Sequence, residues 1–217
     1  MKISWFKHAA FKIKTQDGKV IYIDPYQLSK DEEKADIIIC SHEHGDHFDE
    51  DSIRKISKES TILLGPASIS SKLKKFDGVG LKLYDPYSIG KITVELYPAY
   101  NIKRMRKKDE PFHPKERKWA GILIEAEGKK IYHAGDTERI PEMKKLASKE
   151  IDVAMLPCGG TYTMDFEESA DAAVDINPKL VIPMHNWDVD LEDYQKVVHN
   201  KDPNISVEIL ADKELTI

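Results

Sequence analysis

Residues 36–47 read Asp-Ile-Ile-Ile-Cys-Ser-His-Glu-His-Gly-Asp-His, an apolar run that passes directly into a cluster of polar side chains. The run at 36–40 predicts a short strand that is buried on both faces. The side chains that follow within six residues are those of His42, His44, Asp46 and His47, and Gly45 is expected to give the backbone the freedom to turn. A loop at a strand end can aim all four into one pocket. We therefore interpret the stretch as a metal-binding loop rather than a polar surface loop with chance histidines.

A catalytic zinc ion normally has three protein ligands and one water, so these four candidate ligands are one too many for a single ion. We therefore expect two divalent ions about 3.5–4 Å apart, with further ligands from elsewhere in the chain. Asp136 and His185 are the candidates, because each follows a predicted strand and ligands gather at strand ends in α/β folds. The alternatives are a helix N-cap for Asp136 and a hydrogen-bonded loop histidine for His185.

Hydrophobic patterning predicts two similar halves, each with hairpin-like strands followed by strand–helix–strand units. We expect strands at 2–6, 10–15, 19–23, 36–40, 60–64, 79–83, 91–97, 120–126, 129–133, 152–156, 179–183 and 205–210. We expect helices at 49–57, 67–75, 139–149, 166–176 and 190–199. Two sheets packed face to face, with helices outside, would bury all the apolar runs. The predicted class is therefore α/β (α+β), with a single domain over residues 1–217.

Residues 98–118 interrupt this pattern, because they have no clear periodicity and contain three prolines. A loop of this length in a compact domain is usually functional or disordered, so we expect a long active-site loop here. Its basic run at 103–108 is either a solvated face or a mobile lid that attracts an anionic substrate.

Composition sets further limits on the 217 residues. A net charge of −5 argues against general nucleic-acid binding, and no apolar run approaches the roughly 18 residues of a membrane span. Cys40 and Cys158 are the only cysteines and the N-terminus has no apolar signal region, so we expect a cytoplasmic protein without disulfides. Three Gln and five Asn beside many Lys and Glu are typical of thermophiles. The sequence is also compatible with a homo-oligomer.

Three motifs resemble the metallo-β-lactamase superfamily: His-x-His-x-Asp-His at 42–47, Gly-Asp-Thr at 135–137, and a late strand ending in His185. Lys-His-Ala-Ala-Phe at 7–11, Ile-Asp-Pro at 23–25 and His-Ala-Gly-Asp-Thr at 133–137 are similar to one branch of it. That branch comprises small single-domain proteins related to ascorbate-6-phosphate lactonase and, more distantly, to N-acylethanolamine phospholipase D. The resemblance covers almost the whole chain. It implies a four-layer αββα sandwich with the metal site at one edge between the sheets.

The resemblance also implies a ligand set. His42 and His44 match ligands of the first metal, Asp46, His47 and His185 match ligands of the second, and Asp136 matches the bridging carboxylate. Zinc is the expected ion, and Mn, Fe and Ni also suit histidine with carboxylate.

One ligand position departs from the family pattern. The family usually has another first-metal histidine just after the strand corresponding to 91–97, where this chain reads Tyr-Pro-Ala-Tyr-Asn at 97–101. Either that metal lacks a ligand or a histidine from elsewhere replaces it. His113, in the 98–118 loop, is the first substitute, and an ordinary exposed loop histidine is its alternative. His133 is another substitute, or it hydrogen-bonds a ligand or the substrate.

Several residues around these motifs have two interpretations each. His8 either contacts a metal ligand or the substrate, or has a structural role. Asp24 either orients a ligand histidine or caps a turn. Tyr100 is a candidate for binding substrate or a phosphate oxygen. Trp187 lines the pocket or simply packs. Cys158 is expected to be a small buried residue rather than a nucleophile.

Together these residues predict a metal-dependent hydrolase in which a metal-bound hydroxide, oriented by Asp46, attacks a phosphodiester, a lactone or another ester. The lactonase resemblance favours a lactone, and the phospholipase resemblance favours a phosphodiester from nucleic acid or lipid. A nuclease is disfavoured, because no nucleic-acid module and no net basic charge are present. An oxygen-reducing di-iron protein is disfavoured, because that branch has Glu in place of His44. The alternative from another class is a non-catalytic or regulatory metal-binding protein of the same fold, which the missing histidine near Tyr100 favours.

Overall fold

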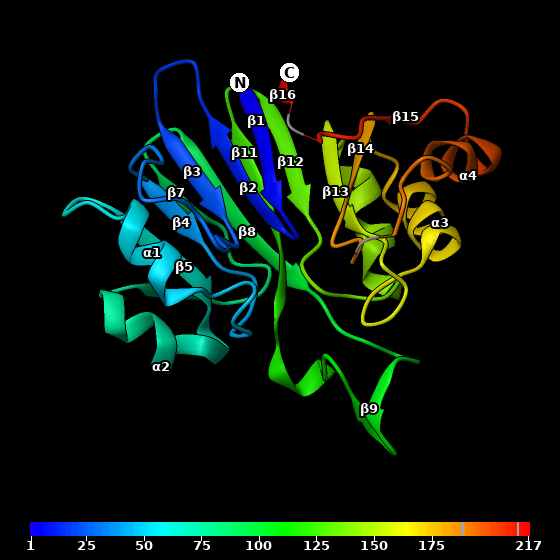
Figure 1. Ribbon diagram of the computed structural model, residues 1–217, viewed down its shortest axis with the longest axis horizontal. Coiled ribbons are helices and arrows are strands. Elements are labelled where there is room, and N and C mark those ends of the chain that lie inside the picture. The colour runs from blue at the N-terminus through cyan, green and yellow to red at the C-terminus, as the bar shows by residue number, and fades with distance from the viewer. Residues whose placement is uncertain (188, 212) are drawn as a thin grey trace. The chain divides into compact units, whose positions relative to one another are not determined.

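The computed structural model describes residues 1–187, 189–211 and 213–217. The chain divides into two compact units, one made of residues 1–85 and 210–217 and the other of residues 86–209. Each unit is built on one seven-stranded mixed sheet (Figure 1). The predicted mixed α/β class is therefore confirmed, whereas a single domain over 1–217 stays a prediction.

The sheet of the first unit has the strand order β16-β1-β2-β3-β4-β5-β6. Its strands are β1 (Lys2–Lys7), β2 (Ala10–Lys14), β3 (Val20–Ile23), β4 (Ile37–Ile39), β5 (Ile62–Pro66), β6 (Val79–Leu81) and β16 (Glu214–Thr216). Pairing is antiparallel from β16 to β3 and parallel from β3 to β6. The β2–β3 hairpin turns at Gly18, whose φ of +85° suits a glycine.

Short helices accompany the parallel strands of this unit. They are α1 (Glu50–Ile56), η1 (Ala67–Ile69), α2 (Ser70–Leu73) and η2 (Lys74–Phe76), and α2 packs against β5 and β6. Asp49 starts α1 as its N-cap, because its side chain accepts a hydrogen bond from the Asp51 N–H. The helix buries Ile53 and Ile56, the two apolar positions that predicted it.

The sheet of the second unit has the order β15-β14-β13-β12-β11-β8-β7. Its strands are β7 (Tyr87–Ile89), β8 (Ile92–Pro98), β11 (Ala120–Ala126), β12 (Lys129–His133), β13 (Val153–Pro157), β14 (Leu180–Met184) and β15 (Ser206–Val207). Pairing is antiparallel from β7 to β12, as expected for the hairpin-like strands of this half, and parallel from β12 to β15. Both units thus show the predicted succession of antiparallel and then parallel strands.

The second unit adds four helical segments and a small hairpin. They are η3 (Lys115–Arg117), η4 (Pro141–Lys149), α3 (Phe166–Ile176), α4 (Tyr194–Lys201), and the hairpin strands β9 (Met105–Lys107) and β10 (Glu110–Pro111). Helix α3 packs on β13 and contacts both η4 and α4. The predicted helix at 166–176 is confirmed to the residue.

Three predicted helices differ from the structure. The segment at 67–75 breaks into η1, α2 and η2, and its serines at 68, 70 and 71 are residues of low helix propensity. The segment at 139–149 forms a 3-10 helix. The helix predicted at 190–199 begins at Tyr194, because the Asp190 carboxylate accepts from the Glu192 N–H and makes a turn instead.

The central parallel strands are buried along their length. Ile37–Ile39 of β4 and Val153–Pro157 of β13 have no exposed residue, as continuous apolar runs predict. Each of these strands ends at a loop that carries polar side chains. None of the helices in the described ranges is long and apolar enough to cross a membrane.

Candidate metal centre

The metal-binding loop predicted at 41–47 follows β4 and belongs to the first unit. The N–H groups of His47 and Phe48 both donate to the His44 carbonyl, at 3.0 and 2.7 Å, and so close a tight turn. Gly45 has no left-handed φ, and an added Cβ there would meet nothing within 4 Å. The expected need for glycine at this position is therefore wrong.

A buried carboxylate organises this loop. Asp24, which is fully buried, accepts hydrogen bonds from the N–H and the hydroxyl of Ser41, each at 2.6 Å, and contacts His47 Nδ1 at 2.7 Å. Because a carboxylate can only accept, His47 Nδ1 carries the proton and Nε2 keeps its lone pair. This is the contact that the orienting role predicted for Asp24 requires.

The same carboxylate acts on His42 through Ser41. The Ser41 hydroxyl donates its hydrogen bond to Asp24, so the hydroxyl oxygen accepts one from His42 Nδ1 at 2.9 Å. His42 therefore also presents Nε2 with a lone pair. That nitrogen lies 3.0 Å from His44 Nδ1, close to the roughly 3.3 Å that separates two nitrogen ligands of a tetrahedral zinc ion.

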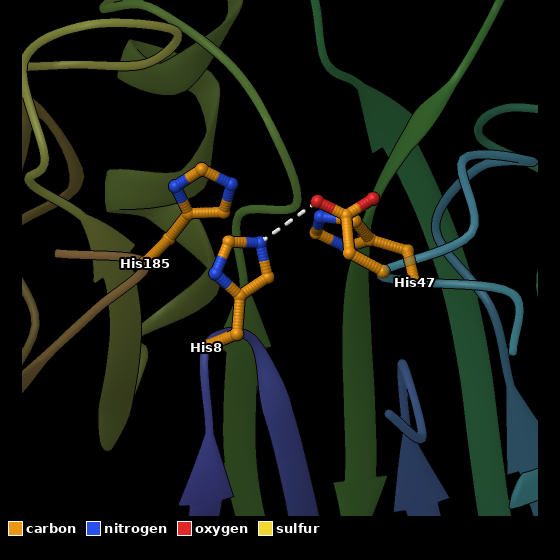
Figure 2. A group of neighbouring side chains, drawn as sticks. His8, His47 and His185 are labelled. Carbon is orange, nitrogen blue, oxygen red and sulfur yellow. Dashed lines mark hydrogen bonds and ion pairs between the residues drawn. The ribbon is translucent and has the colours of Figure 1, made fainter. Parts of the chain in front are cut away.

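Asp46 is paired with His8, at the turn between β1 and β2. His8 Nε2 donates to Asp46 Oδ2 at 3.1 Å, and Figure 2 shows this contact as a dashed line from the tip of the hairpin. The backbone at His8 has a φ of +57°, and its carbonyl accepts from the Trp5 indole at 2.9 Å. His8, Asp46 and His47 each offer a ligand atom within 4.8 Å of the others.

Asp136 is the centre of the ligand group in the second unit. It lies after β12, where Gly135 turns the chain with a φ of +64°, and is 5% exposed. Its Oδ2 atom is 3.2 Å from His113 Nε2 and 3.1 Å from His185 Nε2. His185 follows β14, and His113 comes from the 98–118 loop. One carboxylate oxygen is therefore placed between two imidazole nitrogens, as a bridging ligand would be.

Asn101 determines the tautomer of His113. Its Oδ1 atom accepts from the His113 N–H at 2.8 Å and from Nδ1 at 2.7 Å, while its amide nitrogen donates to the Tyr162 carbonyl at 3.0 Å. His113 Nδ1 thus carries a proton, and in the neutral ring the Nε2 lone pair points toward the Asp136 carboxylate. Two electron-rich atoms at 3.2 Å need a cation between them or a charged imidazolium. The ligand set therefore fits a divalent metal ion.

Glu138 ties the 98–118 loop to the Asp136 turn. Its buried carboxylate accepts from the N–H groups of Ile102, Lys103 and Arg104 at 2.8, 2.8 and 2.6 Å. Arg104 is itself held by Glu138 at 3.3 Å and by Glu168 at 2.6 Å, with its side chain only 15% exposed. Arg104 is therefore neither part of a solvated face nor of a mobile lid, whereas residues 105–109 are exposed.

The remaining predicted residues lie as follows. The Tyr100 hydroxyl donates to Glu142 at 2.8 Å and accepts from Lys115 at 3.0 Å, so substrate binding by Tyr100 stays a prediction. His133 is buried at the end of β12 and accepts from the Gly135 N–H at 3.2 Å, which stabilises the turn before Asp136.

Both cysteines are buried, and neither forms a disulfide. Burial raises the pKa of the Cys158 thiol to about 12. A thiol with this pKa is not a thiolate at neutral pH, so the expectation that Cys158 is no nucleophile is supported.

Sequence reasoning missed Ser41, Asn101 and Glu138. Ser41 directly precedes His42 in the sequence, so a hydroxyl next to a candidate ligand was an available signal, whereas Asn101 lies 12 residues from His113 and gave no such signal. Nothing in the sequence indicates that Glu138 accepts from three consecutive N–H groups.

The chain is similar to known proteins along most of its length. Residues 2–185 match the family model described as beta-lactamase superfamily domain. A UPF0173 metal-dependent hydrolase from Geobacillus sp. (strain WCH70) is 35% identical over 199 residues, which are 85% of each chain. Another from Pyrococcus abyssi is 32% identical over 219 residues, 93% of each chain.

Two solved structures are similar along nearly the whole chain. A Parabacteroides distasonis protein named as a metal-dependent hydrolase has a TM-score of 0.84 and 35% identity, and the match covers 95% of this chain and 91% of that one. Igni18, described as a metallo hydrolase from the hyperthermophilic archaeon Ignicoccus hospitalis, has a TM-score of 0.80 and 25% identity, with 100% and 98% covered.

Proposed function

The chain belongs to the metallo-β-lactamase superfamily, among the UPF0173 metal-dependent hydrolases, and from this premise we propose that it uses two bound divalent ions to hydrolyse a small-molecule phosphodiester, lactone or other ester. Zinc is the first choice for both ions, since imidazole and carboxylate oxygen are its usual ligands beside thiolate. Mn, Fe and Ni suit the same donors.

The proposed ligands divide into two sets around one bridge. His42, His44 and His113 would hold the first ion, Asp46, His47 and His185 would hold the second, and Asp136 would contribute to both. The observation that carries the proposal is the position of Asp136 Oδ2, 3.2 Å from His113 Nε2 and 3.1 Å from His185 Nε2. A carboxylate used as a cap would face backbone N–H groups, as the Asp165 carboxylate faces the Glu168 N–H.

The protein groups have separate tasks in hydrolysis. When bound, the ions supply Lewis acidity that polarises the substrate and lowers the pKa of water. Asp24 holds His42 and His47 in the tautomer that presents Nε2. His8 donates to Oδ2 of Asp46 and so directs the Asp46 carboxylate, which orients the attacking water and takes up its proton.

The non-catalytic alternative rested on the missing histidine near Tyr100. The position of His113 beside Asp136, with its tautomer set by Asn101, offers a substitute ligand from the 98–118 loop. This supports the enzyme over the binding protein.

Metal analysis combined with a substrate screen tests the proposal. We expect zinc-loaded protein to cleave at least one of bis(4-nitrophenyl) phosphate, a simple lactone or 4-nitrophenyl acetate. The double variant Asp46→Ala/His185→Ala should lose metal and hydrolysis together, whereas the matched variant Glu43→Ala/His199→Ala should keep both. A double variant with full metal occupancy, or metal-loaded protein without turnover on any of the three, would contradict the proposal.

A further inference from the structure

Three aromatic side chains of the second unit connect the neighbourhoods of two proposed ligands. The rings of His185 and Trp187 have their centroids 5.8 Å apart, those of Trp187 and Tyr162 are 5.6 Å apart, and those of Tyr162 and Phe112 are 4.8 Å apart. Phe112 directly precedes His113 in the chain. We call Phe112, Tyr162 and Trp187 the aromatic wall.

The aromatic wall is open to solvent, unlike the core of its unit. Trp187 is 50% exposed, and Phe112 and Tyr162 are half-buried. A connected aromatic group that reaches solvent through a half-exposed tryptophan is typical of ligand-binding surfaces rather than of core packing. Trp187, which was expected either to line a pocket or to pack, is thus half exposed and lies next to the proposed ligand His185.

Backbone contacts hold the aromatic wall in place. The Tyr162 carbonyl accepts from the Asn101 amide at 3.0 Å, and the Gly160 carbonyl accepts from Arg104 Nε at 2.8 Å. On the other side, the 185–187 turn packs so closely on Gly159 that an added Cβ would lie 2.5 Å from the His185 carbonyl oxygen and 3.2 Å from Trp187 Cδ1. A surface fixed in advance loses little conformational freedom when a ligand binds.

We propose that the aromatic wall binds a planar aromatic group of the substrate, with Trp187 as its main contact. The inference rests on the proposed function, because it requires that His113 and His185 hold the ions that bind the reacting group. A half-exposed indole offers a flat apolar face, and another ring covers such a face in stacked or edge-to-face contact. The substrate class is therefore an aryl-bearing ester or phosphodiester rather than one with only small aliphatic or polar groups.

Binding of paired phosphonates tests this inference without turnover. Phenylphosphonate and methylphosphonate carry the same metal-binding group and differ in the ring, so the ratio of their affinities reports the aromatic wall alone. For zinc-loaded wild-type protein in calorimetry, we expect phenylphosphonate to bind roughly three- to tenfold more tightly than methylphosphonate. Trp187→Ala should bring the ratio close to one, and Trp187→Phe should restore most of it, since the ring is kept.

Two results would overturn the inference, and they are distinguishable. Equal affinities in wild-type protein, or a ratio that Trp187→Ala leaves intact, would contradict the aromatic wall alone. Failure of both phosphonates to bind zinc-loaded protein would contradict the proposed metal centre as well. Tyr84→Ala, which removes an aromatic side chain 43% exposed and outside the aromatic wall, is the matched control and should leave the ratio unchanged.

Discussion

At the scale of single residues, the site depends on groups that set the tautomers of the ligands. Asp24 and Ser41 leave Nε2 of His42 and His47 as the lone-pair atoms, and Asn101 does the same for His113. A ligand histidine in the wrong tautomer must exchange a proton before it binds metal. Orienting groups of this kind therefore contribute to metal affinity without touching the ion.

Replacing Asp24 with asparagine tests this dependence. The amide cannot accept from His47 and from both donors of Ser41 as a carboxylate does, so we expect zinc affinity to fall about 10- to 100-fold. Competition with a chromogenic chelator measures the affinity. Asp36→Asn is the control, because Asp36 accepts from the Val20 N–H and precedes β4, whereas the metal-binding loop follows that strand. Zinc affinity within twofold of wild type in Asp24→Asn would contradict the orienting role.

The residue scale also shows the limits of sequence reasoning about the site. The close grouping of the candidate ligands at 42–47 was predictable, because they follow one another in a single loop; their role as ligands stays a prediction. The role of Asn101 was not predictable, because its contact with His113 joins two positions 12 residues apart in a loop without periodicity. A local sequence pattern does not indicate a tertiary contact of this kind.

At the scale of elements, strand ends and the loops that follow them carry the proposed ligands. Asp136 follows β12 and His185 follows β14, both parallel-paired strands of one sheet. The long periodic elements were predictable, such as β11, β12 and α3. Short strands such as β7 and β16 were missed, since only their pairing partners make them strands.

The close packing of Gly159 on the 185–187 turn leads to a second prediction. In Gly159→Ala the new Cβ would lie 2.5 Å from the His185 carbonyl oxygen, so the turn must move and His185 with it. We expect a loss of about 1–3 kcal/mol in the free energy of unfolding and weaker zinc binding. Urea unfolding and zinc titration measure the two effects. Gly45→Ala should be tolerated in both assays, because its Cβ meets nothing within 4 Å; equal behaviour of the two variants would refute the packing argument.

Asp152 stabilises the other ends of the same strands and gives a pH-dependent prediction. It accepts from the Lys130 N–H at 2.9 Å and from Lys179 Nζ at 2.8 Å. Burial raises the pKa of Asp152, but these donors outweigh it, so the net shift is downward from the usual 3.8. A lowered carboxyl pKa contributes stability that is complete above 3.8 and is lost as pH falls through the folded-state value.

Asp152→Asn should therefore be less stable than wild type by about 1 kcal/mol at pH 6, a modest value because Lys179 is largely exposed. The difference should shrink as the pH falls below about 4. Urea unfolding at pH 3 to 7 measures it. Asp51→Asn, which alters a carboxylate 74% exposed, should show almost no difference at any pH. A stability difference between wild type and Asp152→Asn that grows toward acid pH would contradict the lowered pKa of Asp152.

At the scale of the whole molecule, the two units repeat one plan. Each begins with antiparallel strands and continues with parallel strands whose loops carry ligands. The C-terminal strand β16 completes the first unit by pairing with β1, and the Ile217 N–H donates to the Met1 carbonyl at 3.0 Å.

The number of zinc ions per chain tests the central claim most directly. Elemental analysis of zinc-loaded wild-type protein, after removal of loosely bound metal, should give two ions per chain. Asp136→Asn should give fewer, because the bridging oxygen is weakened for both ions, while Asp152→Asn should keep the wild-type value. One ion or none in wild-type protein, or two ions retained in Asp136→Asn, would contradict a dinuclear centre bridged by Asp136.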